Sequence, residues 1–264
     1  MDPNFKLPES IRHRLDVEKF CDKVTKALYT NRRDPVGLCG SQERSILTSL
    51  LSRDLDDLET QLKPHNDCML QTPILKDCLI STVITDLFLR ASNLHLHLSA
   101  FFDDPSSEDY RERLLALFFA TTTFLEAVMK LQTQVGMMIS YMPYYIYQMM
   151  VAGGCTLLKL CKSFFAAHID MEYAKGLFNR TIWAIRGASV ISNDLPERLA
   201  EVLAQMWKLG NTPSPKQPSD NVEMDNSLML KVRCRMSMSL LFDSVWRWRE
   251  DTRTKGRNLE GKSS

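Results

Sequence analysis

The chain has 264 residues, 44% of them hydrophobic and 25% charged, which is the balance of a globular protein large enough to bury a substantial core. A net charge of +1 gives no overall attraction to nucleic acid or acidic membranes, so such a partner would have to meet a local patch. Seven cysteines without framework spacing indicate reduced thiols, and the first ten residues lack the apolar segment of a secretory signal. We therefore expect a nuclear or cytoplasmic protein.

Apolar residues recur at helical spacing through the first half of the chain. Ser10 is a candidate cap for a first helix, and a second amphipathic helix follows Ser41. The pair Thr72–Pro73 has the residue types of an N-cap and a first turn, and it predicts a long apolar helix that continues to Phe102. Another long helix is expected from about Ser107, and the short loop between these two predicts antiparallel packing.

The longest uncharged run extends from Leu131 to Leu158 and is flanked by Lys130 and Lys159. A helix that spans a bilayer needs about 20 consecutive apolar residues, so an integral membrane protein is one interpretation. Pro143 divides the run near its middle, and the half before it carries several polar side chains, which favours two helices. We expect the second of them to be a buried central helix over about residues 143–168.

Capping residues mark two further helices. Asp170 is a candidate N-cap for the first. Asp194 and Glu197 have the spacing of a capping box that opens the second, and Gly210 is positioned to close it. Both segments carry apolar residues at helical spacing, so both are expected to pack against the central helix.

The last quarter of the chain is less regular. Residues 211–226 contain three prolines and few side chains that can be buried, which predicts a mobile loop. Residues 230–239 alternate as in a strand, and pattern alone leaves them open between strand and helix. Residues 240–251 return to helical spacing, and the polar tail 252–264 is expected to be disordered. Overall the sequence predicts an all-α fold, with a single multi-helix domain over residues 1–251.

Two acid clusters are similar in arrangement to the magnesium-binding motifs of class I terpene synthases, which are helical enzymes. They comprise Asp103, Asp104 and Glu108 in one case, and Asn193, Asp194 and Glu201 in the other. Ser107 stands where the first motif needs a carboxylate, and Glu197 where the second needs a hydroxyl ligand. We interpret both clusters as loop and cap acids, and we therefore expect that the chain is not an enzyme. We assign no catalytic, cofactor-binding or metal-binding residue. A terpene synthase-like enzyme is kept as an alternative.

Basic residues near the C-terminus form a candidate nucleic-acid or nuclear-import patch. Its members are Arg233, Arg235, Arg247 and Arg249, with Trp246 and Trp248 interleaved. Tryptophans in such a patch can stack on bases, but they also anchor a helix to a core while the arginines remain in water. We favour the anchoring interpretation.

Three stretches resemble the regulatory region of fungal zinc-cluster transcription factors, in the middle homology to C-terminal part of those proteins. They are ALYTNRRDPVGLCGSQERSILTSLLSRDLDDLE (27–59), MPYYIYQMMVAGGCTLLKLCKS (142–163) and RMSMSLLFDSVWRWRED (235–251). The resemblance spans most of the chain. It implies an all-helical regulatory domain, with helix in place of strand at 231–239, and a nuclear protein that contacts other transcription factors or the transcription machinery. It also implies control of one metabolic or secondary-metabolite pathway.

The sequence departs from that family in its cysteines. The family's DNA-binding module holds zinc through cysteines that begin with C-x2-C spacing, and no two cysteines of this sequence have that spacing. We therefore expect a regulator without a zinc cofactor, and a chain that does not by itself select a DNA sequence. We also expect no insertion into a membrane.

Overall fold

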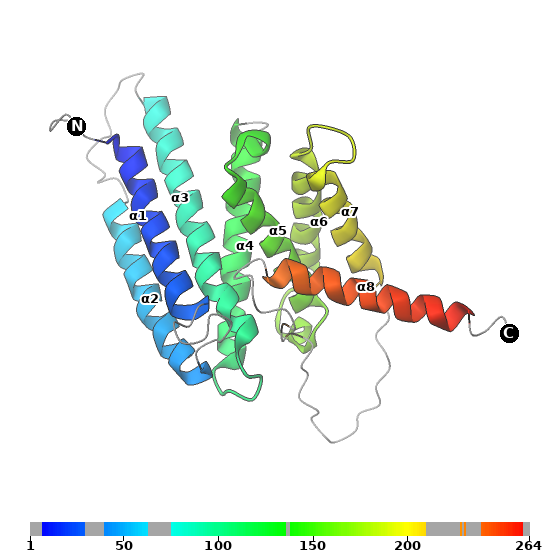
Figure 1. Ribbon diagram of the computed structural model, residues 1–264. Helices are drawn as coiled ribbons and strands as arrows, with labels where there is room; N and C mark the ends of the chain where they lie inside the picture. The colour runs from blue at the N-terminus through cyan, green and yellow to red at the C-terminus, as the bar shows by residue number, and fades with distance from the viewer. Residues whose placement is uncertain are drawn as a thin grey trace.

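Helices form all the regular secondary structure in the part of the chain that the computed structural model describes, which is residues 7–29, 40–62, 75–135, 138–209, 228, 230 and 239–260 (Figure 1). The long helices are α1 (Glu9–Val24), α2 (Ser41–Leu62), α3 (Leu75–His97), α4 (Tyr110–Val135), α5 (Tyr144–Cys161), α6 (Met171–Gly187), α7 (Leu195–Leu209) and α8 (Ser239–Glu260). Shorter turns are η1 (Thr25–Tyr29), η3 (Leu98–Phe102), η4 (Met138–Tyr141) and η5 (Phe164–His168). The described residues contain no strand, which confirms the predicted all-α fold in a single domain.

The helices are arranged roughly in chain order from one side of the molecule to the other (Figure 1). Helices α1, α2 and α3 lie at one side, α4 and α5 in the middle, and α6 and α7 at the other side. Helix α8 lies across α5, α6 and α7, and it packs on α5. As predicted from their short connection, α3 and α4 pack against each other.

Helix α5 is the central helix that the sequence predicted. It packs against α3, α4, α6, α7 and α8, and nearly all its residues from Ile146 to Leu160 are buried. Pro143 precedes its first residue as the N-cap. Because neighbours cover α5 on every side, its apolar circumference is satisfied by other helices of the same chain.

The central helix ends earlier than the predicted 143–168. Its last residue is Cys161, and Lys162 leaves helical geometry with φ −105° and ψ 9°. Ser163 then opens the separate turn η5, and its hydroxyl accepts a hydrogen bond from the Phe165 amide at 3.2 Å. The Lys162 ammonium donates to the carbonyl oxygens of Met206 and Trp207, which lie near the end of α7. These contacts tie the end of α5 to α7 and explain why the helix stops there.

Other helix ends also differ from the prediction. Helix α1 begins at Glu9 after Pro8, so Ser10 lies inside it and is not its cap. Helix α8 continues to Glu260, so the tail expected from residue 252 is helical over its first nine residues. An ion pair at 3.3 Å joins Arg253 of this extension to Glu250 in the preceding turn. The loop predicted at 211–226 and the residues 231–238 lie outside the described part of the chain.

The uncharged run from Leu131 to Leu158 is divided between the end of α4, the turn η4 and α5. Of the described helices, one segment, Tyr110–Thr133 in α4, is long and apolar enough to cross a membrane by length and composition. Its most apolar window is 56% buried inside the protein, and core helices of soluble proteins pass the same test. The finding therefore gives the membrane interpretation only weak support.

Candidate binding groove

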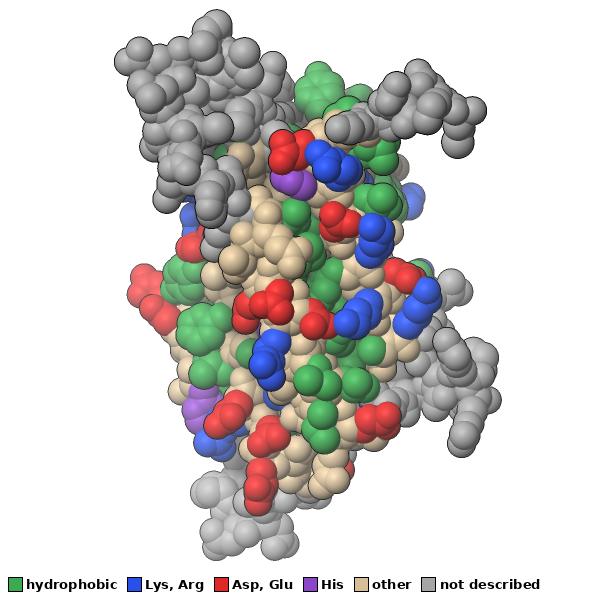
Figure 2. Space-filling model, turned by 90° about the vertical axis from the view of Figure 1, so that its left-hand side faces the viewer, with side chains coloured by type: hydrophobic (Ala, Val, Ile, Leu, Met, Phe, Trp, Pro, Cys, Tyr) green, Lys and Arg blue, Asp and Glu red, His purple; other side chains and the backbone are tan. Residues whose placement is uncertain are grey.

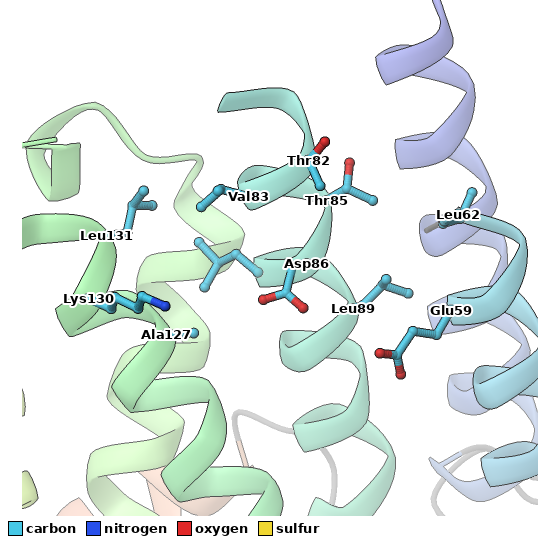
Figure 3. A pocket seen from close by; sticks show the side chains of 11 residues that line it. Glu59, Leu62, Thr82, Val83, Thr85, Asp86, Leu89, Ala127, Lys130 and Leu131 are labelled. Atoms are coloured by element: carbon cyan, nitrogen blue, oxygen red, sulfur yellow. The ribbon is translucent and has the colours of Figure 1, made fainter. Parts of the chain in front are cut away.

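A groove follows α3 between α2 and α4. It consists of two adjoining hollows of about 320 and 380 Å³, which share Glu59, Asp86 and Leu89. Its walls are formed by residues 52–62 of α2 and 123–131 of α4, and its floor by residues 82–97 of α3. Figure 3 shows the Leu62 end, where side chains of all three helices surround the first hollow. We refer to this surface as the α3 groove.

The groove exists because α2 and α4 both pack on α3 and meet near their beginnings. There the Ser45 hydroxyl donates to the Asp109 carboxylate at 3.2 Å, and the Arg113 guanidinium donates to the Thr48 hydroxyl at 3.2 Å. The hollows lie between the later parts of the two helices. The groove is thus closed at one end by polar contacts, and it extends along the later parts of α2 and α4 as far as Leu62.

A buried ion network stabilises the closed end. Asp103, which follows η3, pairs with Arg44 of α2 at 2.8 Å and with Arg113 of α4 at 2.7 Å. The side chains of Arg44 and Asp103 are each only 2% exposed. Removal of one partner from such a network leaves a buried charge without compensation, which typically costs about 3–5 kcal/mol. The network therefore fixes the position of α2 relative to α4.

The two hollows differ in their lining. The first is mainly apolar, with Leu62 of α2, Val83 of α3 and Leu131 of α4, whereas the second is lined mainly by polar side chains. Asp56 of α2 lines the second hollow, and Figure 3 shows Glu59 on the α2 side and Lys130 on the α4 side of the first.

Two groups on the floor of the groove leave this charge pattern unchanged at neutral pH. Asp86 pairs with Arg90 at 2.7 Å, so these two charges offset each other. At the His97 end, burial and the nearby Arg113 charge lower the pKa of His97 to about 4, so its imidazole is neutral. Such an arrangement suits the binding of an amphipathic ligand.

The lining shows no assembled catalytic pair. Ser52 and His97 both line the second hollow, but the contacts of the described residues include no hydrogen bond between them of the kind that joins a nucleophile to its base. Among the described residues, no group of three or more His, Cys, Asp or Glu side chains is placed to hold a metal ion.

The acid clusters compared with terpene synthase motifs have structural roles. Asp103 belongs to the buried ion network, whereas its neighbour Asp104 is exposed and accepts a hydrogen bond from the Ser106 amide. Asp194 accepts from the Glu197 amide at 3.2 Å, and Glu197 accepts from the Asn193 amide at 2.5 Å. The second cluster is therefore a helix cap, close to the predicted capping box, and the enzyme alternative is not favoured.

The candidate basic patch is not brought together by the described residues. Arg233 and Arg235 lie outside the described part of the chain. Arg247 donates from Nε to the Asp243 carboxylate at 2.8 Å, whereas Arg249 is exposed. Residues two apart on a helix point in different directions, so Arg247 and Arg249 do not form one surface.

The Asp243 carboxylate is a buried site that sequence reasoning missed. It is fully buried and also pairs with Lys159 of α5 at 2.8 Å. An i,i+4 pairing with Arg247 is visible in the sequence, but Lys159 is distant along the chain and no pattern pointed to it. The contact of α8 with α5 therefore includes a buried charge cluster.

The surface that Figure 2 shows carries both signs of charge. Acidic and basic side chains alternate over this face, which is the side of the molecule with α1 and α2. Examples are the pairs Lys19–Asp16 at 2.8 Å within α1 and Lys23–Asp54 at 2.5 Å between α1 and α2. Such a face creates no continuous positive field of the kind that attracts a phosphate backbone.

Comparison with known proteins gives one similarity that covers most of the chain. No protein-family model matches the chain, and no solved structure matches it. The chain is similar to Regulatory protein LEU3 of Saccharomyces cerevisiae, with 20% identity over 254 residues. The aligned region covers 91% of this chain but only 29% of that protein. The similarity thus suggests a regulatory region.

Proposed function

We propose that this chain is a regulatory region of a fungal transcriptional regulator and acts through contacts with other proteins. The observation that carries the proposal is the similarity to a yeast regulatory protein over 91% of the chain. The three stretches that resemble the regulatory region of zinc-cluster factors also support it, and they lie in and around α2, α5 and α8. The α3 groove supplies a surface of a type that protein partners use.

Tethering the chain to an unrelated DNA-binding domain tests this proposal directly. The fusion is expressed in a yeast that carries binding sites for the DNA-binding domain upstream of a reporter gene. Reporter expression is compared with that produced by the DNA-binding domain alone. We expect reporter expression to change severalfold in one direction. A fusion that accumulates in the nucleus and leaves expression unchanged would contradict the proposal.

We further propose that the chain alone does not select a DNA sequence. Specific recognition needs side chains delivered to base edges by a positioned element. The net charge of +1, the pairing of Arg247 with the buried Asp243 and the mixed charges of the face shown in Figure 2 all support this view. In a mobility-shift assay at physiological salt, we expect equal binding to a promoter fragment and to a scrambled duplex. Preference for one sequence would contradict the proposal and direct attention to Arg249.

Localisation and target range follow from the same proposal. A fluorescently tagged chain should accumulate in the nucleus, although a cytoplasmic pool is compatible with regulation by transport. The resemblance to zinc-cluster factors favours targets in a single metabolic or secondary-metabolite pathway. Transcript profiling after deletion of the gene is the measurement that checks this, and a change spread over unrelated pathways would contradict it.

A further inference from the structure

We propose that the α3 groove binds an amphipathic helix of a partner protein, with basic residues on the side that faces α2 and apolar residues directed into the groove. The inference rests on the proposed function, because it names the surface and the kind of partner through which the chain would act.

The dimensions of the groove fit a helix of about 15 residues. Its floor extends from Thr82 to His97 on α3, and a rise of 1.5 Å per residue gives a length of roughly 22 Å. The two hollows lie one after the other along this floor and meet at Asp86 and Leu89. A helix laid in the groove would present residues at i, i+3, i+4 and i+7 to them, which is the usual pattern of helix-in-groove recognition.

The first hollow, at the Leu62 end of the groove, provides an apolar anchor site. Leu62, Val83 and Leu131 line it from three different helices. Its volume of about 320 Å³ is roughly twice that of a cavity known to admit benzene, so it has room for two anchoring side chains. Buried apolar anchors of this kind supply most of the binding energy in typical protein interfaces.

The charges at the margins specify the orientation of the partner. Asp56 and Glu59 belong to the α2 side and Lys130 to the α4 side; Figure 3 shows Glu59 and Lys130 on these opposite sides. A partner helix with Lys or Arg toward α2 and an acidic residue toward Lys130 complements this pattern. The reverse arrangement would place like charges side by side.

A displayed library of 15-residue helices tests the inference while the partner itself is unidentified. The library carries leucine at i, i+3, i+4 and i+7 and random residues on both flanks, and it is selected against the full chain. We expect enrichment of Lys and Arg on one flank and of acidic residues on the other. Failure to enrich any helix, or enrichment of acidic residues on both flanks, would overturn the proposal.

Two adjacent carboxylates supply a matched pair of charge variants. Asp56 lines the groove, while its neighbour Asp57 is exposed on α2 and does not line it. In fluorescence anisotropy with a selected peptide at low salt, Asp56→Lys should weaken binding about tenfold, because it places a cation beside the basic flank. Asp57→Lys makes the same change of net charge and should alter binding less than twofold. Equal effects of the two variants would overturn the proposal.

A second pair of variants tests the anchor site itself. Ala127 lies on the α4 side of the first hollow. Ala127→Trp should fill the hollow and reduce peptide affinity at least tenfold, whereas Ala127→Ser should leave the affinity unchanged. Circular dichroism of both variants establishes that they retain the fold. If sedimentation shows that the chain dimerises and Ala127→Trp abolishes the dimer, the occupant is a second copy and the proposal is wrong.

The reporter fusion separates failure of this inference from failure of the proposed function. If Asp56→Lys abolishes the reporter response and Asp57→Lys does not, the groove is the regulatory surface. If neither variant changes the response, the regulatory function stands but the groove is not its surface, and the inference is overturned. If the unmodified fusion gives no response although selected peptides bind with the expected charge dependence, the groove inference stands and the regulatory function fails.

Discussion

Gly153 and Gly154 are neighbours inside α5, yet replacement by alanine should have opposite effects at the two positions. Alanine stabilises a helix interior by about 1 kcal/mol relative to glycine. A Cβ added at Gly154 would lie 3.6 Å from Leu203 Cδ1 and 3.7 Å from Thr181 Cγ2, which is ordinary van der Waals contact. Gly154→Ala should therefore raise the free energy of unfolding by about 1 kcal/mol.

At Gly153 the added carbon meets the neighbouring helix. It would lie 3.1 Å from Cδ2 and 3.3 Å from Cγ of Leu125 in α4, and the Leu125 side chain is fully buried. Overpacking of a core costs about 1–3 kcal/mol, which offsets the gain in helix propensity. Gly153→Ala should therefore lower the free energy of unfolding by up to about 2 kcal/mol, or leave it unchanged.

Urea unfolding followed by circular dichroism measures both variants against the unmodified chain. The two alanine variants should differ by about 1–3 kcal/mol, and each kcal/mol corresponds to roughly 2–4 °C in Tm for a chain of this size. Gly154→Leu should be destabilising, because its further carbons enter the space held by Leu203 and Thr181. Equal stabilisation by both alanine substitutions would refute the close approach of α5 and α4 at Gly153.

Two further predictions concern buried charges and pH. Asp243→Ala should lower the free energy of unfolding, measured in urea, by about 3–5 kcal/mol, because it leaves Lys159 buried without its carboxylate. Glu250→Ala on the same helix should change it by less than about 1 kcal/mol. Similar losses in the two variants would contradict the buried ion pair between Asp243 and Lys159. Burial lowers the pKa of His95 from 6.5 to about 4, so between these pH values the unfolded chain binds more protons than the folded chain. The stability that neutral His95 contributes is therefore complete above pH 6.5. It is lost as the pH falls toward 4, by up to about 3 kcal/mol. His95→Gln should reduce the dependence of unfolding free energy on pH in that window, and an unchanged slope would contradict this.

The sequence by itself determined the fold class and the position of most helices, because periodic apolar residues and local capping groups specify a helix within a short segment. Pro143, the N-cap of α5, illustrates this, because its ring restricts the backbone at the position where the helix begins. Asp170 does so too, because its carboxylate accepts from the amides of Glu172 and Tyr173 at 3.0 Å each.

The tertiary structure alone decided which polar residues are buried and where a groove lies. Asp103 has the sequence context of an exposed loop acid, and it is buried because Arg44 and Arg113 approach it from two other helices. Lys159 has the context of a flanking surface lysine, and it is covered because α8 delivers Asp243 to it. The α3 groove likewise depends on the relative placement of three helices. Long-range contacts of this kind leave no periodic signal, because each partner is compatible with solvent until another element covers it.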